Sequence, residues 1–168
     1  MLILALESST TSAKAMLYST TDGVLDIKTK EYLPEHNDVR TQDPDGVFME
    51  TVELGKTVGG NHEIDCIVLG GAWHSVFLCN KDMKPQTKVF SWANTSAAKI
   101  ADSIREDKED VLNFYKTTGC MVNAIYPAFK LMYFREQGYN LEDYYIFGQG
   151  SYNTYRLTGK RVVTDSMA

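Results

Sequence analysis

Hydrophobic and polar residues are arranged in short blocks along the first third of the chain. Residues 2–6 form an unbroken aliphatic run, which predicts a strand buried on both faces. Residues 13–18 predict the returning strand of a tight pair, and the alternation over 24–33 predicts a third antiparallel strand. Asp43 then predicts an N-cap, with proline at the first helical position, for a helix that stops at Gly59.

The remaining pattern predicts short strands alternating with helices. Residues 65–71 predict a buried strand that runs into a glycine turn. Further strands are predicted over 75–79, 89–92, 144–147 and, as a start only, 162–164, and helices over 96–105, 108–117, 124–137 and 151–157. Three strands, a helix and a strand flanked by helices is the order of the ribonuclease-H-like, actin-like ATPase domain. We therefore expect an α/β fold with a mixed sheet, three leading antiparallel strands and flanking helices.

Composition narrows the class of protein. The 168 residues are 43% hydrophobic and 23% charged, as in a globular protein, and the net charge of −5 argues against nucleic acid or anionic membrane as partner. No apolar run approaches the roughly 18 residues of a membrane span, and no secretory signal is visible. The three cysteines, Cys66, Cys79 and Cys120, form no CxxC pair, which fits reduced thiols. We expect core cysteines in a cytoplasmic protein.

The turn after the first strand carries the first candidate chemistry. Glu7 ends the apolar run, five hydroxyl residues follow it without a break, and Lys14 opens the next apolar segment. Such a turn presents backbone N–H groups and hydroxyls that can hold phosphate oxygens, and a carboxylate beside it can hold Mg²⁺ through water. An ordinary hairpin with a polar tip is the alternative, and the spacing alone does not decide between the two.

This turn resembles the first phosphate loop of the FGGY carbohydrate kinases, whose pattern is Asp-x-Gly-Thr-Thr-Ser-x-Arg/Lys. Glu7 stands where the family has Asp, and Ser9 where it usually has Gly. The resemblance implies that Glu7 holds Mg²⁺ through water, that the threonines and loop amides take the γ-phosphate oxygens, and that Lys14 offsets their charge. The phosphate- and magnesium-binding set it implies is Glu7, Ser8, Thr10, Thr11, Ser12 and Lys14.

A second candidate site follows the strand at 65–71. Trp73 and His74 would stand at the carboxyl end of a strand, where ligands gather in open α/β sheets. An indole stacks on a sugar face and an imidazole donates to hydroxyl or carboxylate oxygens; a core Trp and a structural His are the alternative. The family carries Met-His-Gly or Met-His-Ser here, facing the sugar, which implies substrate contacts from Trp73, His74 and Ser75.

Asn94 is the fourth candidate substrate-binding residue. Residues 92–96 lie where the family usually has Trp-x-Asp-x-Arg, with Asn94 in place of the acid and Ser96 in place of the base. Asn94 or Thr95 is equally suited to cap the helix that follows, and we take the cap as the default.

Later stretches extend the resemblance over nearly the whole chain. They are similar to the family's Thr-Gly, Pro-x-x-Lys-Leu, Leu-Thr-Gly and Thr-Asp-x-Ser-x-Ala motifs, at residues 118–119, 127–131, 157–159 and 164–168. Lys130, within the second of these, is more often a solvated or carbonyl-bonded lysine than a ligand. Individually the motifs are weak, whereas together and in the family's order they are specific.

The resemblance implies the amino-terminal part of a kinase that transfers the γ-phosphoryl group of ATP, with Mg²⁺, to a sugar or sugar-acid hydroxyl. Gluconate is the favoured acceptor, and xylulose, another sugar or a polyol are alternatives. A non-catalytic actin-like nucleotide-binding module and a degenerate kinase also remain open. We expect residues 1–168 to lack the carboxyl-terminal ATP-binding domain and the aspartate base, which would follow Ala168. Alone they should be inactive, ATP-poor and homodimeric, because an exposed sheet edge favours self-association.

Overall fold

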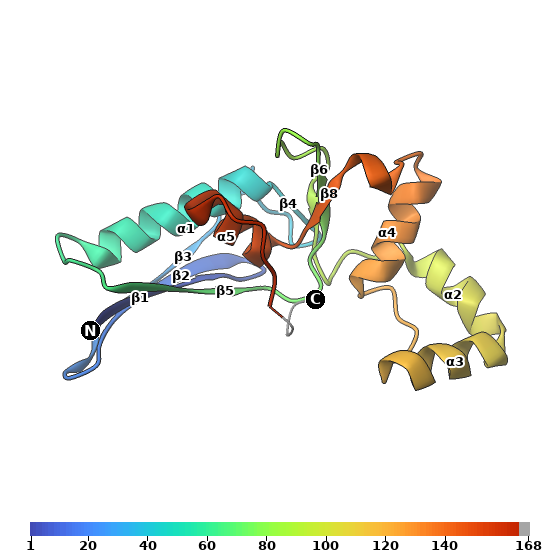
Figure 1. Cartoon of the computed structure of the whole chain (residues 1–168), viewed down its shortest axis with the longest axis horizontal. Helices are drawn as coiled ribbons and strands as arrows, with labels where there is room; N and C mark the ends of the chain where they lie inside the picture. Colours follow the sequence, from blue (N-terminus) through green and yellow to red (C-terminus); the bar gives the residue numbers. More distant parts are fainter. Residues whose placement is uncertain (165–168) are drawn as a thin grey trace.

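The computed structural model describes residues 1–164, and a four-stranded mixed sheet forms its centre. The strand order is β3-β2-β1-β5 (Figure 1). The strands are β1 (Leu2–Ser8), β2 (Ser12–Ser19), β3 (Gly23–Glu31) and β5 (Cys66–Gly71). Strand β2 is antiparallel to both β1 and β3, whereas β5 runs parallel to β1. The α/β fold and the three leading antiparallel strands are confirmed.

Helix α1 (Pro44–Gly59) packs against β1 and β2 and builds the main core. It begins as predicted, since the Asp43 side chain accepts a 2.6 Å hydrogen bond from the Gly46 amide. Gly55 lets the helix approach the sheet, because a Cβ there would come within 2.7 Å of the Leu6 side chain. The core between them consists of Leu4, Leu6, Ala13, Ala15, Leu17, Tyr32, Val47, Leu54 and Val58.

The opposite face of the sheet is more open than predicted. Leu4, Leu6 and the Ser8 side chain are buried, but the alternate positions of β1 are only half-buried, so burial on both faces was wrong. Strand β5 is likewise not a buried strand, since Val68 is 50% exposed. Ile27 of β3, on the same face and separated from β5 by β1 and β2, is 63% exposed. An aliphatic run shows that a strand forms, but it does not show how many of its faces are covered.

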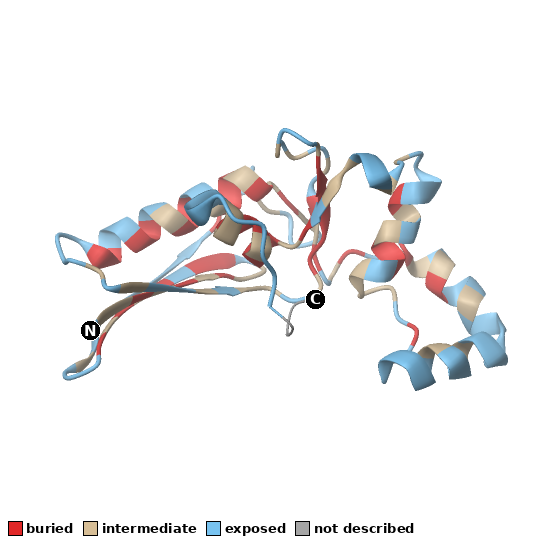
Figure 2. Cartoon of the chain, in the orientation of Figure 1, coloured by how far each residue is buried: buried red, intermediate tan, exposed pale blue. Residues whose placement is uncertain are grey.

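The second half of the chain adds two small sheets and a helical end. The strands are β4 (Thr41–Gln42) with β7 (Val89–Phe90) and β6 (Phe77–Cys79) with β8 (Tyr145–Phe147). The helices are α2 (Ala98–Glu106), α3 (Lys108–Thr118), α4 (Pro127–Glu136), the short η1 (Leu141–Asp143) and α5 (Gln149–Thr158). Figure 1 places α2, α3 and α4 together, away from the amino terminus, while α5 lies beside α1. No residue of α3 is buried, as its pale colour in Figure 2 shows.

Several boundaries differ from the prediction. Helix α4 begins at Pro127 rather than residue 124, because Tyr126 before the proline is extended. Helix α5 begins two residues earlier than expected, and residues 162–164 do not form the predicted strand start. The last motif, 164–168, lies mostly outside the described residues. Among the cysteines, all free, only Cys79 is buried. Within residues 1–164 no helix is long and apolar enough to cross a bilayer.

Candidate functional site

The loop Ser9–Thr11 between β1 and β2 is held by its carbonyl groups. The buried Gln42 side chain donates from Nε2 to the carbonyl oxygens of Thr10 at 3.0 Å and Ser9 at 3.4 Å. In a trans peptide the N–H points away from the C=O of the same unit. The amides of Thr10 and Thr11, which share these two peptide units, therefore face the other way. Two adjacent N–H donors are thus presented, an arrangement that suits phosphate oxygens.

The Thr10 hydroxyl is oriented by a residue far away in the sequence. Trp92, half-exposed, donates from Nε1 to Thr10 Oγ1 at 3.0 Å. An indole N–H is a donor only, so the hydroxyl oxygen must be the acceptor in this bond. The single proton of Thr10 Oγ1 therefore remains available to a ligand oxygen.

Two hydroxyls of the predicted phosphate-binding set point inward instead. Ser8 is 1% exposed, and its Oγ lies 3.0 Å from Thr51 Oγ1 and accepts a 2.6 Å bond from Asn153 Nδ2. Ser12 is also buried, with its Oγ 3.1 Å from Ser9 Oγ. The Ser8 and Ser12 side chains are thus buried and engaged by neighbouring hydroxyl or amide groups. Phosphate contacts from these two residues stay a prediction.

Glu7 and Lys14 face each other across β1 and β2. Their side chains form a 3.1 Å ion pair, and each is a little under half exposed. No group of three or more His, Cys, Asp or Glu side chains within residues 1–164 could by itself enclose a metal ion. A single half-exposed carboxylate beside a phosphate-binding loop fits Mg²⁺ contacted through its water shell, since Mg²⁺ keeps several waters and takes further oxygens from phosphate.

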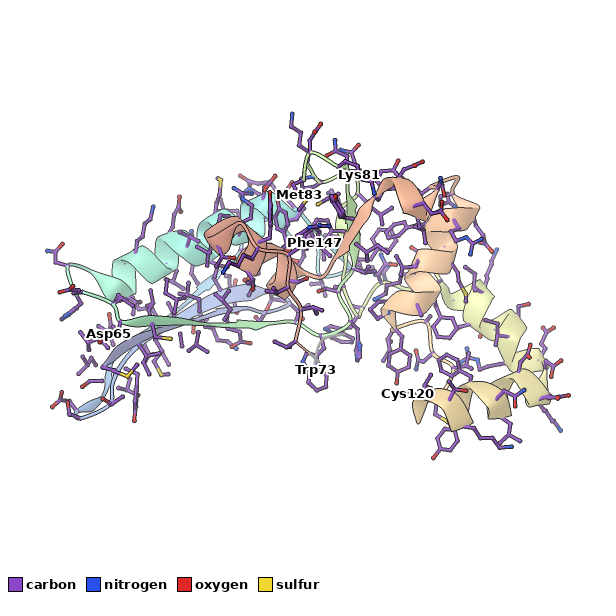
Figure 3. All side chains as sticks on the ribbon, in the orientation of Figure 1. Asp65, Trp73, Lys81, Met83, Cys120 and Phe147 are labelled. Atoms are coloured by element: carbon purple, nitrogen blue, oxygen red, sulfur yellow. The ribbon has the colours of Figure 1, made fainter. Side chains whose placement is uncertain are left out.

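The second candidate loop, residues 72–75, presents two aromatic side chains. Trp73 is 61% exposed, and Figure 3 shows it projecting from the end of β5. His74 has a positive φ of 59°, an uncommon conformation for a residue other than glycine, and its ring packs edge-on against Tyr126 at 5.0 Å. Burial, together with the nearby charge of Lys130, lowers the pKa of His74. Its imidazole is therefore neutral at pH 7.

Lys130 of α4 holds this loop in place. Its side chain is 0% exposed, and its Nζ donates to three carbonyl oxygens, His74 at 2.8 Å, Ser91 at 2.6 Å and Ile125 at 2.8 Å. Because an ammonium has three protons, every donor is used. Burial lowers the pKa of Lys130 to about 8, which leaves it mainly charged at pH 7. The prediction of a carbonyl partner is confirmed.

The side chains of Ser75 and Asn94 form hydrogen bonds with backbone groups. The buried Ser75 Oγ donates to the Ala72 carbonyl at 3.2 Å and accepts from the Gln149 amide at 3.0 Å. Asn94 is buried, and its Oδ1 accepts from the Ser96 amide at 3.0 Å. Both side chains are therefore engaged by backbone groups. Asn94 nevertheless does not cap α2, whose N-cap is Ala97 without a side-chain bond, and Thr95 does not cap it either.

A cavity of about 650 Å³ opens beside Trp73 and His74. Its walls come from the 72–76 loop, the end of α3 with Cys120, the start of α4, β8 and residues 161–163. Arg161 is the only charged residue lining it within the described chain, and its guanidinium lies 4.1 Å over the Tyr145 ring. A mostly apolar cavity with aromatic walls and one cation suits a small polar or anionic ligand.

The sequence analysis did not identify four buried polar residues that support the two loops. They are Gln42, Thr51, Gln149 and Asn153. For Gln149 and Asn153 a signal was present, because two amides four residues apart share a helix face and can bond across the core. For Gln42 there was none, since its partners lie more than 30 positions earlier in the chain.

Comparisons with known protein families, sequences and structures all find carbohydrate kinases. The model of the FGGY family of carbohydrate kinases, N-terminal domain, matches residues 2–168. Gluconokinases of Bacillus licheniformis and Bacillus subtilis (strain 168) are 28% and 27% identical over 134 residues, which are 77% of this chain and 26% of theirs.

Solved structures share the fold. A gluconate kinase and a ligand-bound xylulose kinase, both from Lactobacillus acidophilus, superpose with a TM-score of 0.86 at 23% identity, over 99% of this chain and 35% of each of theirs. The chain spans about a quarter to a third of the length of these relatives. Because the family model covers almost every residue, the chain belongs to the FGGY family of carbohydrate kinases.

Proposed function

We propose that this chain is the phosphate-loop and sugar-binding wall of an ATP-dependent kinase that phosphorylates a hydroxyl of gluconate. The observation that carries the proposal is loop 9–11, whose carbonyls are fixed inward by Gln42 and whose Thr10 hydroxyl is aimed by Trp92. Sheet order β3-β2-β1-β5 supports a ribonuclease-H-like, actin-like ATPase domain, with the loop at the carboxyl end of β1.

The proposed roles follow from the geometry of the loop. The amides of Thr10 and Thr11 and the Thr10 hydroxyl bind γ-phosphate oxygens, and Lys14 offsets their charge. Glu7 contacts the hydration shell of Mg²⁺, which neutralises charge on the phosphates when bound. Phosphoryl transfer depends mainly on such positioning and charge neutralisation.

Gluconate is favoured as the acceptor on two grounds. The curated relatives are gluconokinases, and the cavity at Trp73 and His74 contains one cation, Arg161, and no carboxylate among its described lining residues. Since His74 is neutral at pH 7, we assign the substrate carboxylate to Arg161 and a hydroxyl to His74. A xylulose, other sugar or polyol kinase is the second candidate, favoured by the fold match to xylulose kinase.

A matched pair of ligands tests this assignment. Gluconate and glucitol share a six-carbon chain but differ in the carboxylate, so Arg161→Gln should weaken gluconate binding about tenfold and leave glucitol unchanged. The exposed Arg135→Gln on α4 is the control. A preference for xylulose or glycerol over gluconate of about tenfold would assign the site to the second candidate.

The domain assignment is a further part of the proposal. We place residues 1–168 as the amino-terminal portion of a cytoplasmic kinase whose adenosine-binding domain and aspartate base lie outside the chain. The isolated chain should not turn over ATP, because one wall of a cleft cannot hold both substrates in line. Gluconate-dependent ADP release by purified residues 1–168 would contradict it. In the complete protein, Glu7→Gln should reduce turnover far more than gluconate affinity.

The exposed sheet face supports a proposed homodimer. Ile27 and Val68 on this face are each half exposed or more, and β5 is an edge strand of the described sheet. Sedimentation velocity on residues 1–168 tests it; a monomer at all concentrations excludes self-association of the isolated chain. A non-catalytic actin-like module is separated from the kinase by gluconate binding, which such a module lacks.

A further inference from the structure

A buried chain of hydrogen bonds runs from α5 through β1 into α1. Thr51 Oγ1 donates its only proton to the Val47 carbonyl at 2.8 Å, so in its 3.0 Å contact with Ser8 it must accept. The Ser8 Oγ proton is thereby used, and Ser8 Oγ accepts from Asn153 Nδ2 at 2.6 Å. The direction of each bond is fixed by counting protons.

The same count fixes the two side-chain amides on α5. Gln149 Nε2 donates to Asn153 Oδ1 at 2.9 Å and to the Pro44 carbonyl at 3.0 Å, which uses both of its protons. Rotating the Asn153 amide by 180° would place its oxygen against Ser8 Oγ, which has no proton left to donate. All four side chains in the chain are buried, so a lost partner is not replaced by bulk water.

A second contact joins α5 to the other candidate loop. The Gln149 backbone amide donates to Ser75 Oγ at 3.0 Å, and Ser75 Oγ donates to the Ala72 carbonyl at 3.2 Å. Gly148 permits this approach, because a Cβ there would come within 3.0 Å of the Ser75 carbonyl oxygen. The start of α5 therefore rests on the end of loop 72–75.

We propose that α5 clamps the two loops to each other, with Asn153 and Gln149 as positioning residues. Asn153 donates from its side chain to Ser8, the residue before loop 9–11. Gln149 donates from its backbone amide to Ser75, the last residue of loop 72–75. The two strands also pair directly up to Ser8 and Gly71, and just beyond this ladder the Ala72 amide donates to the Ser8 carbonyl at 3.0 Å. The clamp fixes the separation of the two loops and, as far as the proposed function holds, the separation of phosphate donor and acceptor.

Hydrogen exchange on residues 1–168 tests the clamp without any ligand. Two hydrogen-bonded amides report on the loops, Ser9 to the Ser12 carbonyl and Ala72 to the Ser8 carbonyl, and the Asp65 amide at the far end of the sheet is the reference. In Asn153→Leu, which keeps the volume and removes the polar atoms, both loop amides should exchange about tenfold faster relative to Asp65.

Tyr152→Phe is the matched control on the same helix. The Tyr152 hydroxyl donates to Asp45 of α1 at 2.6 Å and contacts neither loop, so its loss should leave the ratio of loop to reference exchange unchanged. Ser75→Ala removes the Gln149 contact and the bond to the Ala72 carbonyl but leaves the Asn153–Ser8 bond intact, so it should speed exchange at Ala72 more than at Ser9. If Asn153→Leu does not fold, Ser8→Ala removes the same bond from the strand side.

Three results would overturn the clamp: faster exchange at one loop amide only in Asn153→Leu, no change at either, or the same change in Tyr152→Phe. The catalytic meaning needs a separate readout. In the complete protein, Asn153→Leu should raise the dissociation constants of both gluconate and Mg–ATP by about fivefold, while Tyr152→Phe changes neither. If wild type binds neither ligand but the exchange result holds, the clamp stands and the proposed function fails.

Discussion

The two candidate loops lie at the ends of adjacent parallel strands, yet they are held in different ways. Loop 9–11 is fixed by several neutral donors, Gln42 on its carbonyls, Trp92 on Thr10 and Asn153 on Ser8. Loop 72–75 depends on the ammonium of Lys130, which also holds Ser91 and Ile125, and on the Ser75 hydroxyl. A loop held by several neutral hydrogen bonds should keep its position when one bond is lost. A loop held mainly by one buried charged group should lose more stability when that group is removed.

The largest effect is expected from Lys130→Met. The buried Ser91 carbonyl and the partly buried His74 and Ile125 carbonyls lose their donor, at roughly 1–3 kcal/mol each. Relief from burying a charge offsets part of this, so the free energy of unfolding should fall by about 2 kcal/mol. Urea denaturation measures it, with the exposed Lys99→Met as control. The pKa of His74 should rise toward its ordinary value, because Lys130 no longer opposes its protonation. A loss no greater than in the control would show that the ammonium does not hold the loop.

The second prediction concerns pH and separates the charged support from the neutral ones. The pKa of Lys130 is lowered from 10.5 to about 8 by burial, so between these values the unfolded chain binds more protons than the folded one. Stability from this group therefore rises with pH in that window, by at most about 1.4 kcal/mol per pH unit. Burial also raises the pKa of Cys79 and of Tyr32 to about 12. Above pH 9 the folded chain therefore keeps these protons longer than the unfolded chain, and stability from these groups falls as pH rises.

The difference between wild type and Lys130→Met isolates the lysine, since Cys79 and Tyr32 titrate in both. That difference, measured by urea denaturation from pH 7 to 10.5, should change slope near pH 8. Loosening of loop 72–75 can be followed separately by fluorescence. With Trp92→Phe, Trp73 is the remaining tryptophan, and its emission should titrate near pH 8 only when Lys130 is present. A flat difference would place the Lys130 titration outside this range.

Sequence alone predicted the elements that have local signals and failed where partners are distant. Asp43 before Pro44 is such a signal, and α1 begins there. Lys130 could be expected to bond carbonyls, but not those of His74 and Ser91, which lie 56 and 39 residues away. Ser8 was predictable in hindsight, because Leu4, Leu6 and Ser8 occupy alternate positions of one strand and so share its buried face.

The third prediction tests the neutral support of loop 9–11. Gln42→Leu keeps most of the volume but leaves the Thr10 carbonyl without its donor, so stability should fall by about 1 kcal/mol. Binding of Mg–ATP in the complete protein should weaken several-fold, because the Thr10 and Thr11 amides are no longer held outward. The exposed Gln86→Leu is the control. Unchanged nucleotide binding would show that the loop keeps its orientation without Gln42.

The smallest effect on stability is expected from Trp92→Phe. The indole is half-exposed and makes one neutral hydrogen bond, so the free energy of unfolding should change by no more than about 0.5 kcal/mol. The Thr10 hydroxyl, no longer forced to accept from the indole, can rotate its proton away from the ligand. Mg–ATP affinity in the complete protein should then fall about two- to fivefold, the value of one neutral hydrogen bond. Thr10→Val removes the hydroxyl itself, and in that background Trp92→Phe should have no further effect on affinity. An additive loss in the double variant would mean that Trp92 acts on the nucleotide by another route than Thr10.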